Sequence, residues 1–239
     1  MKTLKLLLTI IVVGTLGFFS CDTGNEVVEP PVPIRKNVLI LSDEGTETGV
    51  QGIYSSTDFD AFMGGNYWEF DGSNLANYDL VILLSGVNYA EEVSEEVQLK
   101  LIEYVNAGGT LLTTEWITYY SSLYPILYQW SPVKYDGEWG VSGESYTVMT
   151  DHTITKDLPA TFTLPENWSY SKQTLNTEIG VNATTLIEGS ESASALSIRK
   201  IGNGHNIHWS MAGAYGGTDI WSDEAKQILI NIGDFAVGN

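Results

Sequence analysis

The sequence has only one cysteine, Cys21, in 239 residues. Without a second cysteine the chain can form no internal disulfide, so its stability must come from an ordinary hydrophobic core. Histidine is also scarce, with three residues, and no pair of them has the spacing of metal ligands on a helix. We therefore predict neither a metal site nor a cofactor.

Basic residues are few as well. Eleven Lys and Arg stand against thirty Asp and Glu, which gives a formal net charge of −19. Nucleic-acid binding relies on clustered basic side chains, so this composition excludes nucleic acid as a partner. A basic patch for an anionic membrane surface is excluded on the same ground. The acidity otherwise indicates good solubility and points to no particular function.

The first twenty residues have the pattern of an export signal. Two lysines precede an apolar run over 6–19, which ends at a small residue and is too short for a membrane span. Residues 16–21 resemble a bacterial lipobox, with Phe18 where Leu is commoner. The resemblance implies cleavage after residue 20 and lipidation of Cys21. The alternative is an ordinary secreted protein whose apolar run ends beside a cysteine.

Lipidation at Cys21 would place the protein in the bacterial cell envelope, anchored to a membrane on the periplasmic face or at the cell surface. Loss of the signal peptide 1–20 would leave nine basic residues against thirty acidic ones, a net charge of −21. Residues 21–36 hold three prolines and little apolar surface, which indicates an extended tether. We expect one folded domain over 37–239, because no second linker or internal repeat is visible.

Short apolar runs joined by a capped helix predict an α/β fold. Continuous apolar stretches at 37–42, 78–85 and 110–114 are typical of strands buried on both faces. Between the last two, Ser94 begins an amphipathic helix that ends at the glycine pair 108–109. A strand, a helix and a strand with short joints form the unit of a parallel sheet.

The last part of the chain has equally clear signals. Strands at 195–201 and 205–211 flank the glycine-rich joint 202–204, which predicts a hairpin. Ser222 then caps an amphipathic closing helix. The stretch 67–70 is predicted as a further short strand.

These segments resemble a known superfamily. The run 78–86, followed by a helix and strand that contain 104–112, is similar to the core of class I glutamine-amidotransferase-like domains. Within that superfamily the ThuA-like (trehalose utilisation) branch is most similar, because 151–159 and the glycine joint with its closing helix resemble segments of that branch. The resemblance implies a flavodoxin-like three-layer sandwich with a mainly parallel sheet.

One departure from the superfamily bears on activity. Glutaminase members carry a cysteine nucleophile after the strand that follows the glycine pair, whereas residues 111–116 here read Leu-Leu-Thr-Thr-Glu-Trp. Cys21 lies outside the predicted domain and cannot replace that thiol. Hydrolysis of glutamine through a thioester requires a thiolate. We therefore do not expect glutaminase activity.

Candidate site residues follow from the predicted topology, because ligands of open parallel sheets bind beyond the carboxyl ends of the strands. Six residues follow the predicted strands there: Asp43, Glu44, Ser85, Gly86, Glu115 and Trp116. His208 lies on the polar face of its predicted strand and could point into the same crevice, or could be a hydrogen-bonded structural residue. A catalytic site would use Glu115, His208 and Asp43. The alternative is that the carboxylates are solvated loop acids.

Aromatic residues are concentrated between 116 and 139, where eight occur, including Trp116, Trp130 and Trp139. Flat rings beside carboxylates suit the C–H faces and hydroxyls of sugars. The alternative is that these rings pack over the sheet as core. We therefore predict binding or accessory handling of a small polar ligand, carbohydrate first. The alternatives are a hydrolase or sugar-modifying enzyme and an envelope protein–protein scaffold.

Overall fold

The computed structural model describes residues 36–43, 47–86, 88, 90–142, 145–164, 169–178, 180–210 and 221–238. Three predictions therefore lie outside the described residues: the signal 1–20 with the tether 21–36 except its last residue, which begins the first strand, lipidation of Cys21, and the proposed ligand contact of Glu44. Among the described residues, no helix is long and apolar enough to cross a membrane.

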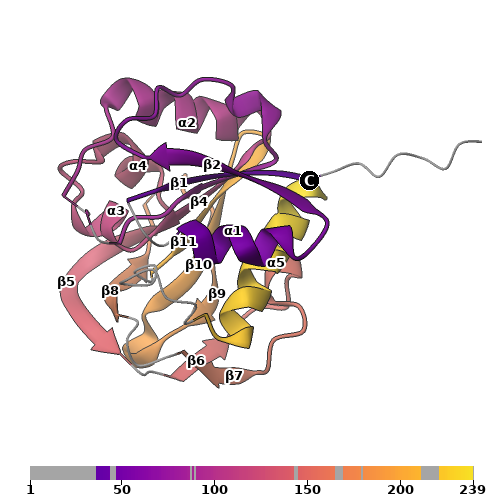
Figure 1. Cartoon of the computed structure of the whole chain (residues 1–239). Coiled ribbons are helices and arrows are strands. Elements are labelled where there is room, and N and C mark those ends of the chain that lie inside the picture. The colour runs from indigo at the N-terminus through magenta and orange to yellow at the C-terminus, as the bar shows by residue number, and fades with distance from the viewer. Residues whose placement is uncertain are drawn as a thin grey trace, which may run out of the picture. The chain divides into compact units, whose positions relative to one another are not determined.

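Within these residues the main sheet has nine strands in the order β2-β1-β3-β4-β11-β10-β9-β6-β7 (Figure 1). They are β1 (Lys36–Ser42), β2 (Phe59–Asn66), β3 (Leu80–Leu83), β4 (Thr110–Thr114), β6 (Ser145–Val148), β7 (Thr161–Thr163), β9 (Ala183–Glu188), β10 (Ser194–Ile201) and β11 (Gly204–Trp209). A two-stranded sheet pairs β5 (Val133–Ser142) with β8 (Ser169–Leu175). The helices are α1 (Glu47–Ser55), α2 (Glu95–Ala107), α3 (Trp116–Tyr119), α4 (Pro125–Trp130) and α5 (Asp223–Val237).

The parallel half of the sheet confirms the predicted fold class. β2, β1, β3, β4 and β11 are parallel neighbours, with Leu41 opposite Leu83 and Leu83 opposite Thr113. The three apolar runs predicted as neighbouring strands are thus adjacent in one sheet. β10 pairs antiparallel with β11, as the glycine joint predicted, and β9, β6 and β7 continue the sheet in antiparallel pairs.

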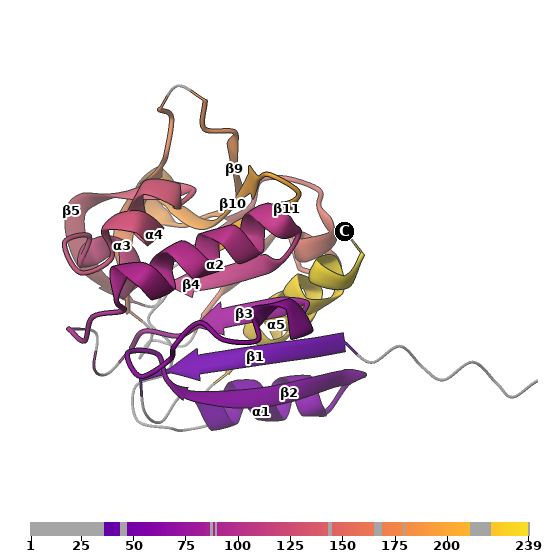
Figure 2. The same cartoon turned by 90° about the horizontal axis from the view of Figure 1, so that it is seen from above.

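Two hydrophobic layers, one on each face of the sheet, make the three-layer sandwich. Leu80 and Ile82 of β3 pack with α1 and α5, whereas Val81 and Leu83 pack with α2 and α4. Figure 2 shows α2 and α1 on opposite sides of the parallel strands. Both faces of β3 are fully buried, which is why its sequence is a continuous apolar run with no alternation.

Capping residues set the helix ends where the sequence predicted them. The Ser94 hydroxyl accepts a hydrogen bond from the backbone N–H of Val97 at the start of α2. Gly108 ends α2 with φ 128°, a backbone conformation that favours glycine. Ser222 caps α5 in the same way as Ser94, by accepting from the Ala225 N–H at 3.2 Å.

Two predictions about strands need correction. Residues 67–69 form a turn, and the strand that precedes them is β2 at 59–66. β2 lies at the edge of the sheet and contains two glycines, so its half-exposed residues lack the apolar run that marks a buried strand. β11 ends at Trp209, short of the predicted limit at 211.

Candidate functional site

The topology brings the ends of β1, β3 and β4 to one edge of the sheet. Leu41, Leu83 and Thr113 are register partners, so Asp43, Ser85 and Glu115 follow at the same level. With neighbouring strands about 4.8 Å apart, Asp43 lies about 10 Å from Glu115 across β3. The backbones of these two residues are therefore separated by the width of β3, although they occupy the same edge.

Asp43 holds the loop that follows β3. One carboxylate oxygen, Oδ2, accepts hydrogen bonds from the backbone N–H groups of Gly86 at 2.6 Å and Asn88 at 2.8 Å. The Asn88 side-chain amide donates back to the Asp43 carbonyl at 3.0 Å. Asp43 is also fully buried. These contacts assign Asp43 a structural part in the loop, and its predicted catalytic part stays a prediction.

The predicted ligand contacts Ser85 and Gly86 are engaged inside the protein. The Ser85 N–H donates to the Thr114 hydroxyl at 3.0 Å, and the Gly86 N–H donates to Asp43. The Ser85 side chain is buried beside the hydroxyls of Tyr67 and Tyr124. The backbone N–H groups of Ser85 and Gly86 are therefore not directed at a ligand.

Tyr67 and Tyr124 are neighbours of this loop that sequence reasoning did not select as site residues. The Tyr67 hydroxyl donates to the Asn88 carbonyl at 2.8 Å, and the Tyr124 hydroxyl lies 3.3 Å from that of Tyr67. Burial raises the pKa of Tyr67 to about 12, and burial also raises the pKa of Tyr124. Both hydroxyls stay protonated at neutral pH and act as hydrogen-bond donors to the loop.

Glu115 lies at the point where β4 turns into α3. Its N–H donates to the Trp209 carbonyl at 3.2 Å, and its own carbonyl accepts from the Thr118 hydroxyl at 3.1 Å. The side chain is only 1% exposed. Glu115 therefore occupies the strand-to-helix turn at which the resemblance places a cysteine nucleophile, and it brings a buried carboxylate to that position.

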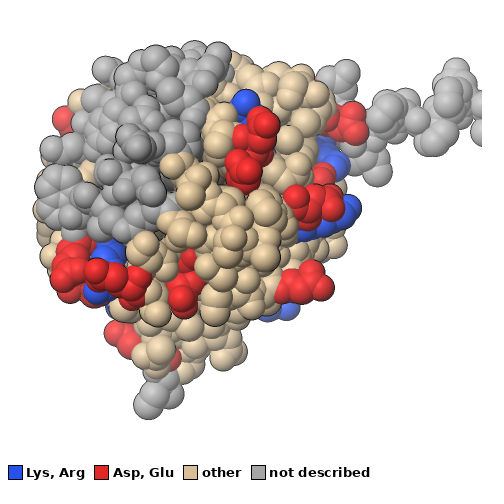
Figure 3. Space-filling model, turned by 90° about the horizontal axis from the view of Figure 1, so that it is seen from below, with Lys and Arg blue, Asp and Glu red and all other residues tan. Residues whose placement is uncertain are grey.

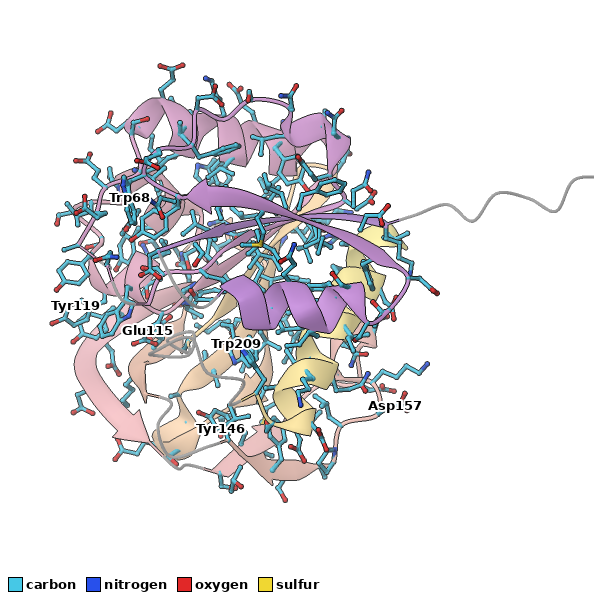
Figure 4. The ribbon with its side chains drawn as sticks, viewed as in Figure 1. Trp68, Glu115, Tyr119, Tyr146, Asp157 and Trp209 are labelled. Atoms are coloured by element: carbon cyan, nitrogen blue, oxygen red, sulfur yellow. The ribbon has the colours of Figure 1, made fainter. Side chains whose placement is uncertain are left out.

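Aromatic residues lie near Glu115, and they differ in how far they are buried. Trp116 is 4% exposed, so its ring packs inside the protein and does not present an open face at the surface. Tyr119 and Tyr135 are only half-buried, and their ring centroids lie 4.9 Å apart. Figure 4 shows Tyr119 outside Glu115 at the periphery of the domain. Burial, then the charges of Tyr119, Asp136 and Glu115, raise the pKa of Tyr135.

The other two predicted tryptophans lie elsewhere. Trp130, at the end of α4, is half-buried and its ring stacks on the Arg199 guanidinium at 4.9 Å. Trp139 belongs to β5, and its side chain is outside what the structure describes. The structure therefore does not bring Trp130 into the group around Glu115.

His208 lies on β11, beside Thr113 of β4 and one strand away from Glu115. Its imidazole is fully buried, and Nδ1 lies 2.9 Å from the Thr113 hydroxyl. Burial lowers the pKa of His208 to about 3, so the ring is neutral near pH 7. Glu115 and His208 thus come from adjacent strands, whereas Asp43 is three strands away from His208.

In the part of the chain that the structure describes, neither charge nor metal ligands mark a separate site. Within the described residues, no group of three His, Cys, Asp or Glu side chains could hold a metal ion. Figure 3 shows acidic side chains in separate groups over one face, with basic side chains beside some of them. Lys172, for example, contacts Glu191 at 2.9 Å and Glu138 at 3.4 Å.

A groove lies at the opposite edge of the sheet. It has a volume of about 600 Å³ and is lined by Asp79, Lys100, Tyr104 and Gly108, among others. Asp79 precedes β3 and Gly108 precedes β4, so the groove is at the amino ends of the strands. Ligands of open α/β sheets bind at the carboxyl ends, and the group around Glu115 therefore remains the candidate site.

Comparison with known proteins supports the fold. No protein-family model matches the chain, and no curated protein sequence matches it. A ThuA-like protein from Bacteroides uniformis has 14% identity and a TM-score of 0.64, over 90% of this chain and 96% of that one. A protein from Thermoplasma acidophilum, named for one of the subunits of GMP synthase, has 12% identity and a TM-score of 0.59, over 85% and 95% of the two chains. The domain shares the ThuA-like fold.

A third similar structure belongs to a larger protein. The β-galactosidase of Bacillus circulans has 15% identity and a TM-score of 0.60, over 85% of this chain but 31% of that enzyme. At such identities these likenesses establish the fold and no activity. They confirm the α/β, flavodoxin-like architecture that the sequence resemblance implied.

Proposed function

We propose that this protein is an exported, lipid-anchored domain that binds or helps to process a small polar ligand, with carbohydrate as the first class to test. The observation that carries the proposal is the position of Glu115, a buried carboxylate at the strand-to-helix turn, beside the half-buried rings of Tyr119 and Tyr135. Rings stack on the C–H faces of sugars, and carboxylates accept bonds from their hydroxyls.

The fold neighbours agree with this ligand class. Two of the similar structures are named ThuA-like and one is a β-galactosidase. The carbohydrate class thus has support from the residues and, independently, from the names of proteins that share the fold. Glutamine hydrolysis is the activity that the site does not support, because Glu115 stands at the turn where the superfamily carries its thiol.

Titration with a panel of sugars would test the proposal. Purified protein is titrated by calorimetry with glucose, galactose, trehalose and short oligosaccharides. We expect Tyr119→Ala to weaken the binding of any active sugar by about ten- to a hundredfold, the effect of about 1–3 kcal/mol for a lost stacking ring. Tyr128→Ala is the matched control, because Tyr128 is also half-buried but contacts Lys134. Equal loss in both variants, or no binding by any sugar, would contradict the proposal.

An enzymatic function is the second candidate, and one observation favours it. Glu115 directly follows β4 and His208 lies on the adjacent strand β11, both are buried, and a carboxylate there can act as a general acid or base. A sugar that is turned over by the wild type should still bind to Glu115→Gln but no longer react. A variant that keeps its turnover would rule out Glu115 as the acid or base.

A further inference from the structure

Three polar side chains form a row across neighbouring strands. Thr113 of β4 is the register partner of His208 on β11, and His208 is the register partner of Ser197 on β10. All three lie on the α2 and α4 face, since the residues that alternate with them, Leu112, Ile207 and Ile198, pack with the opposite layer. Directly opposed side chains have Cβ atoms about 5 Å apart.

The next row of this face differs in that its donor groups are paired, although Asn206 Oδ1 also has no partner among the described residues. Arg199 and Asn206 are also register partners, and each is engaged with the end of α4. The Arg199 guanidinium donates to the Gln129 carbonyl at 3.0 Å, and the Asn206 amide donates to the Trp130 carbonyl at 3.0 Å. These two residues bind the free carbonyls of a helix terminus, so their burial has a structural reason.

His208 and Ser197 have no such reason within the described part of the chain. Both are fully buried, and neither His208 Nε2 nor Ser197 Oγ has a hydrogen-bond partner among the described residues. His208 Nδ1 lies within hydrogen-bond distance of the Thr113 hydroxyl, whereas Nε2, on the other side of the ring, has no partner among the described residues. Buried polar atoms are nearly always paired with protein or with ordered water.

His208 Nε2 lacks a partner among the described residues in either tautomer of the ring. If the Thr113 hydroxyl donates to the Ile207 carbonyl, at 3.3 Å, it accepts from Nδ1–H and leaves Nε2 a bare acceptor. If Thr113 donates to Nδ1 instead, Nε2–H is a donor without an acceptor. A hydroxyl group is both donor and acceptor, so it satisfies Nε2 in either tautomer and can bond to Ser197 as well.

We propose that His208 and Ser197 form a binding site for one neutral hydroxyl group. In the protein without ligand that group is a water molecule, and in the liganded protein it is a hydroxyl of the bound molecule. A charged group does not fit, because neither His208 in its neutral form nor Ser197 offers a counter-charge, and burying an unpaired ion is costly. The ligand half of this inference rests on the proposed function, whereas the water half does not.

Nitrogen NMR of the full chain with ¹⁵N-labelled histidine is the test. We expect His208 Nε2 to have the shift of a hydrogen-bonded nitrogen and its neighbouring protons to show contacts to a slowly exchanging water. Ser197→Ala should move the Nε2 shift toward that of a free ring nitrogen. Ser194→Ala is the matched control, because Ser194 lies on the same strand but bonds to Thr185 at 2.9 Å. A wild-type Nε2 without any hydrogen bond would overturn the proposal, whatever the variants do.

Added glycerol and trehalose separate the two sources of the hydroxyl. If a sugar binds by calorimetry and shifts His208 Nε2, the ligand half is supported. If a sugar binds and leaves Nε2 unchanged, the ligand half is wrong although the proposed function stands. If no sugar binds but the water signature is present, the proposed function fails and the hydroxyl site stands with water as its occupant.

Discussion

Burial of neutral His208 should make the protein sensitive to acid. Its pKa is lowered to about 3 by burial, from 6.5 in an exposed chain. Between these values the unfolded chain binds a proton that the folded protein does not. The free energy of unfolding contributed by this group is therefore fully present above pH 6.5 and is lost as the pH falls toward 3.

The size of the effect follows from the proton balance. One proton changes the free energy of unfolding by about 1.36 kcal/mol per pH unit, so lowering the pH from 6.5 to 5 removes about 2 kcal/mol. Domains are stable by about 5–15 kcal/mol in total, so a loss of 2 kcal/mol is readily measured. Most carboxylates titrate below this range, which keeps the window nearly free of their contribution.

Urea denaturation followed by tryptophan fluorescence at several pH values between 5 and 7 would measure this slope. We expect His208→Gln to remove most of the slope, because a neutral amide takes up no proton. His152→Gln is the control: burial also lowers the pKa of His152, but that side chain is half-buried, so its contribution is smaller. If His208→Gln and the wild type lose stability equally between pH 6.5 and 5, the imidazole is not held neutral by burial.

Three further predictions concern other parts of the molecule. Replacing Gln98 by Met should lower the free energy of unfolding, measured in urea, by at least about 2 kcal/mol, because the buried Gln98 amide makes four hydrogen bonds to backbone groups. Leu99→Ala is the control: Leu99 is adjacent but exposed, so this change should cost under about 0.5 kcal/mol. Gly109→Ala should cost on the order of 1–3 kcal/mol, because a Cβ there would meet the Tyr104 ring. Cys21→Ala should move the protein from the membrane fraction to the soluble exported pool, and unchanged membrane binding would contradict lipidation.

Much of the sheet and two of its helices could be predicted because their signals are local. A strand buried on both faces has a continuous apolar run, and Ser94 and Ser222 mark helix starts with a side-chain cap. β2 carries no such signal, since Phe62 and Met63 are 45% and 38% exposed at the sheet edge. The position of β2 depends on its pairing with β1, and the local sequence of β2 carries no signal for that pairing.

The sequence was sufficient to assign the candidate site to one edge of the sheet, but not to predict the contacts of its residues. The rule for parallel sheets placed Asp43 and Glu115 at that edge, but the use of Asp43 depends on two backbone N–H groups more than forty residues away. Likewise, a tryptophan that follows a strand can either stack on a ligand or pack in the hydrophobic core, and the sequence does not distinguish the two. Trp116 is buried, which favours the core. Tyr119, at the other end of the same four-residue helix, stays half-exposed.

The absence of a thiol at residue 115 has a consequence that extends beyond glutaminase activity. A cysteine nucleophile needs an open approach to its substrate, whereas Glu115 is 1% exposed. A buried carboxylate serves a ligand by accepting hydrogen bonds or holding a proton, and both require that the ligand be dehydrated around it. His208, on the strand next to β4, is also buried and neutral. This arrangement agrees with the proposed binding of a neutral, hydroxyl-rich molecule.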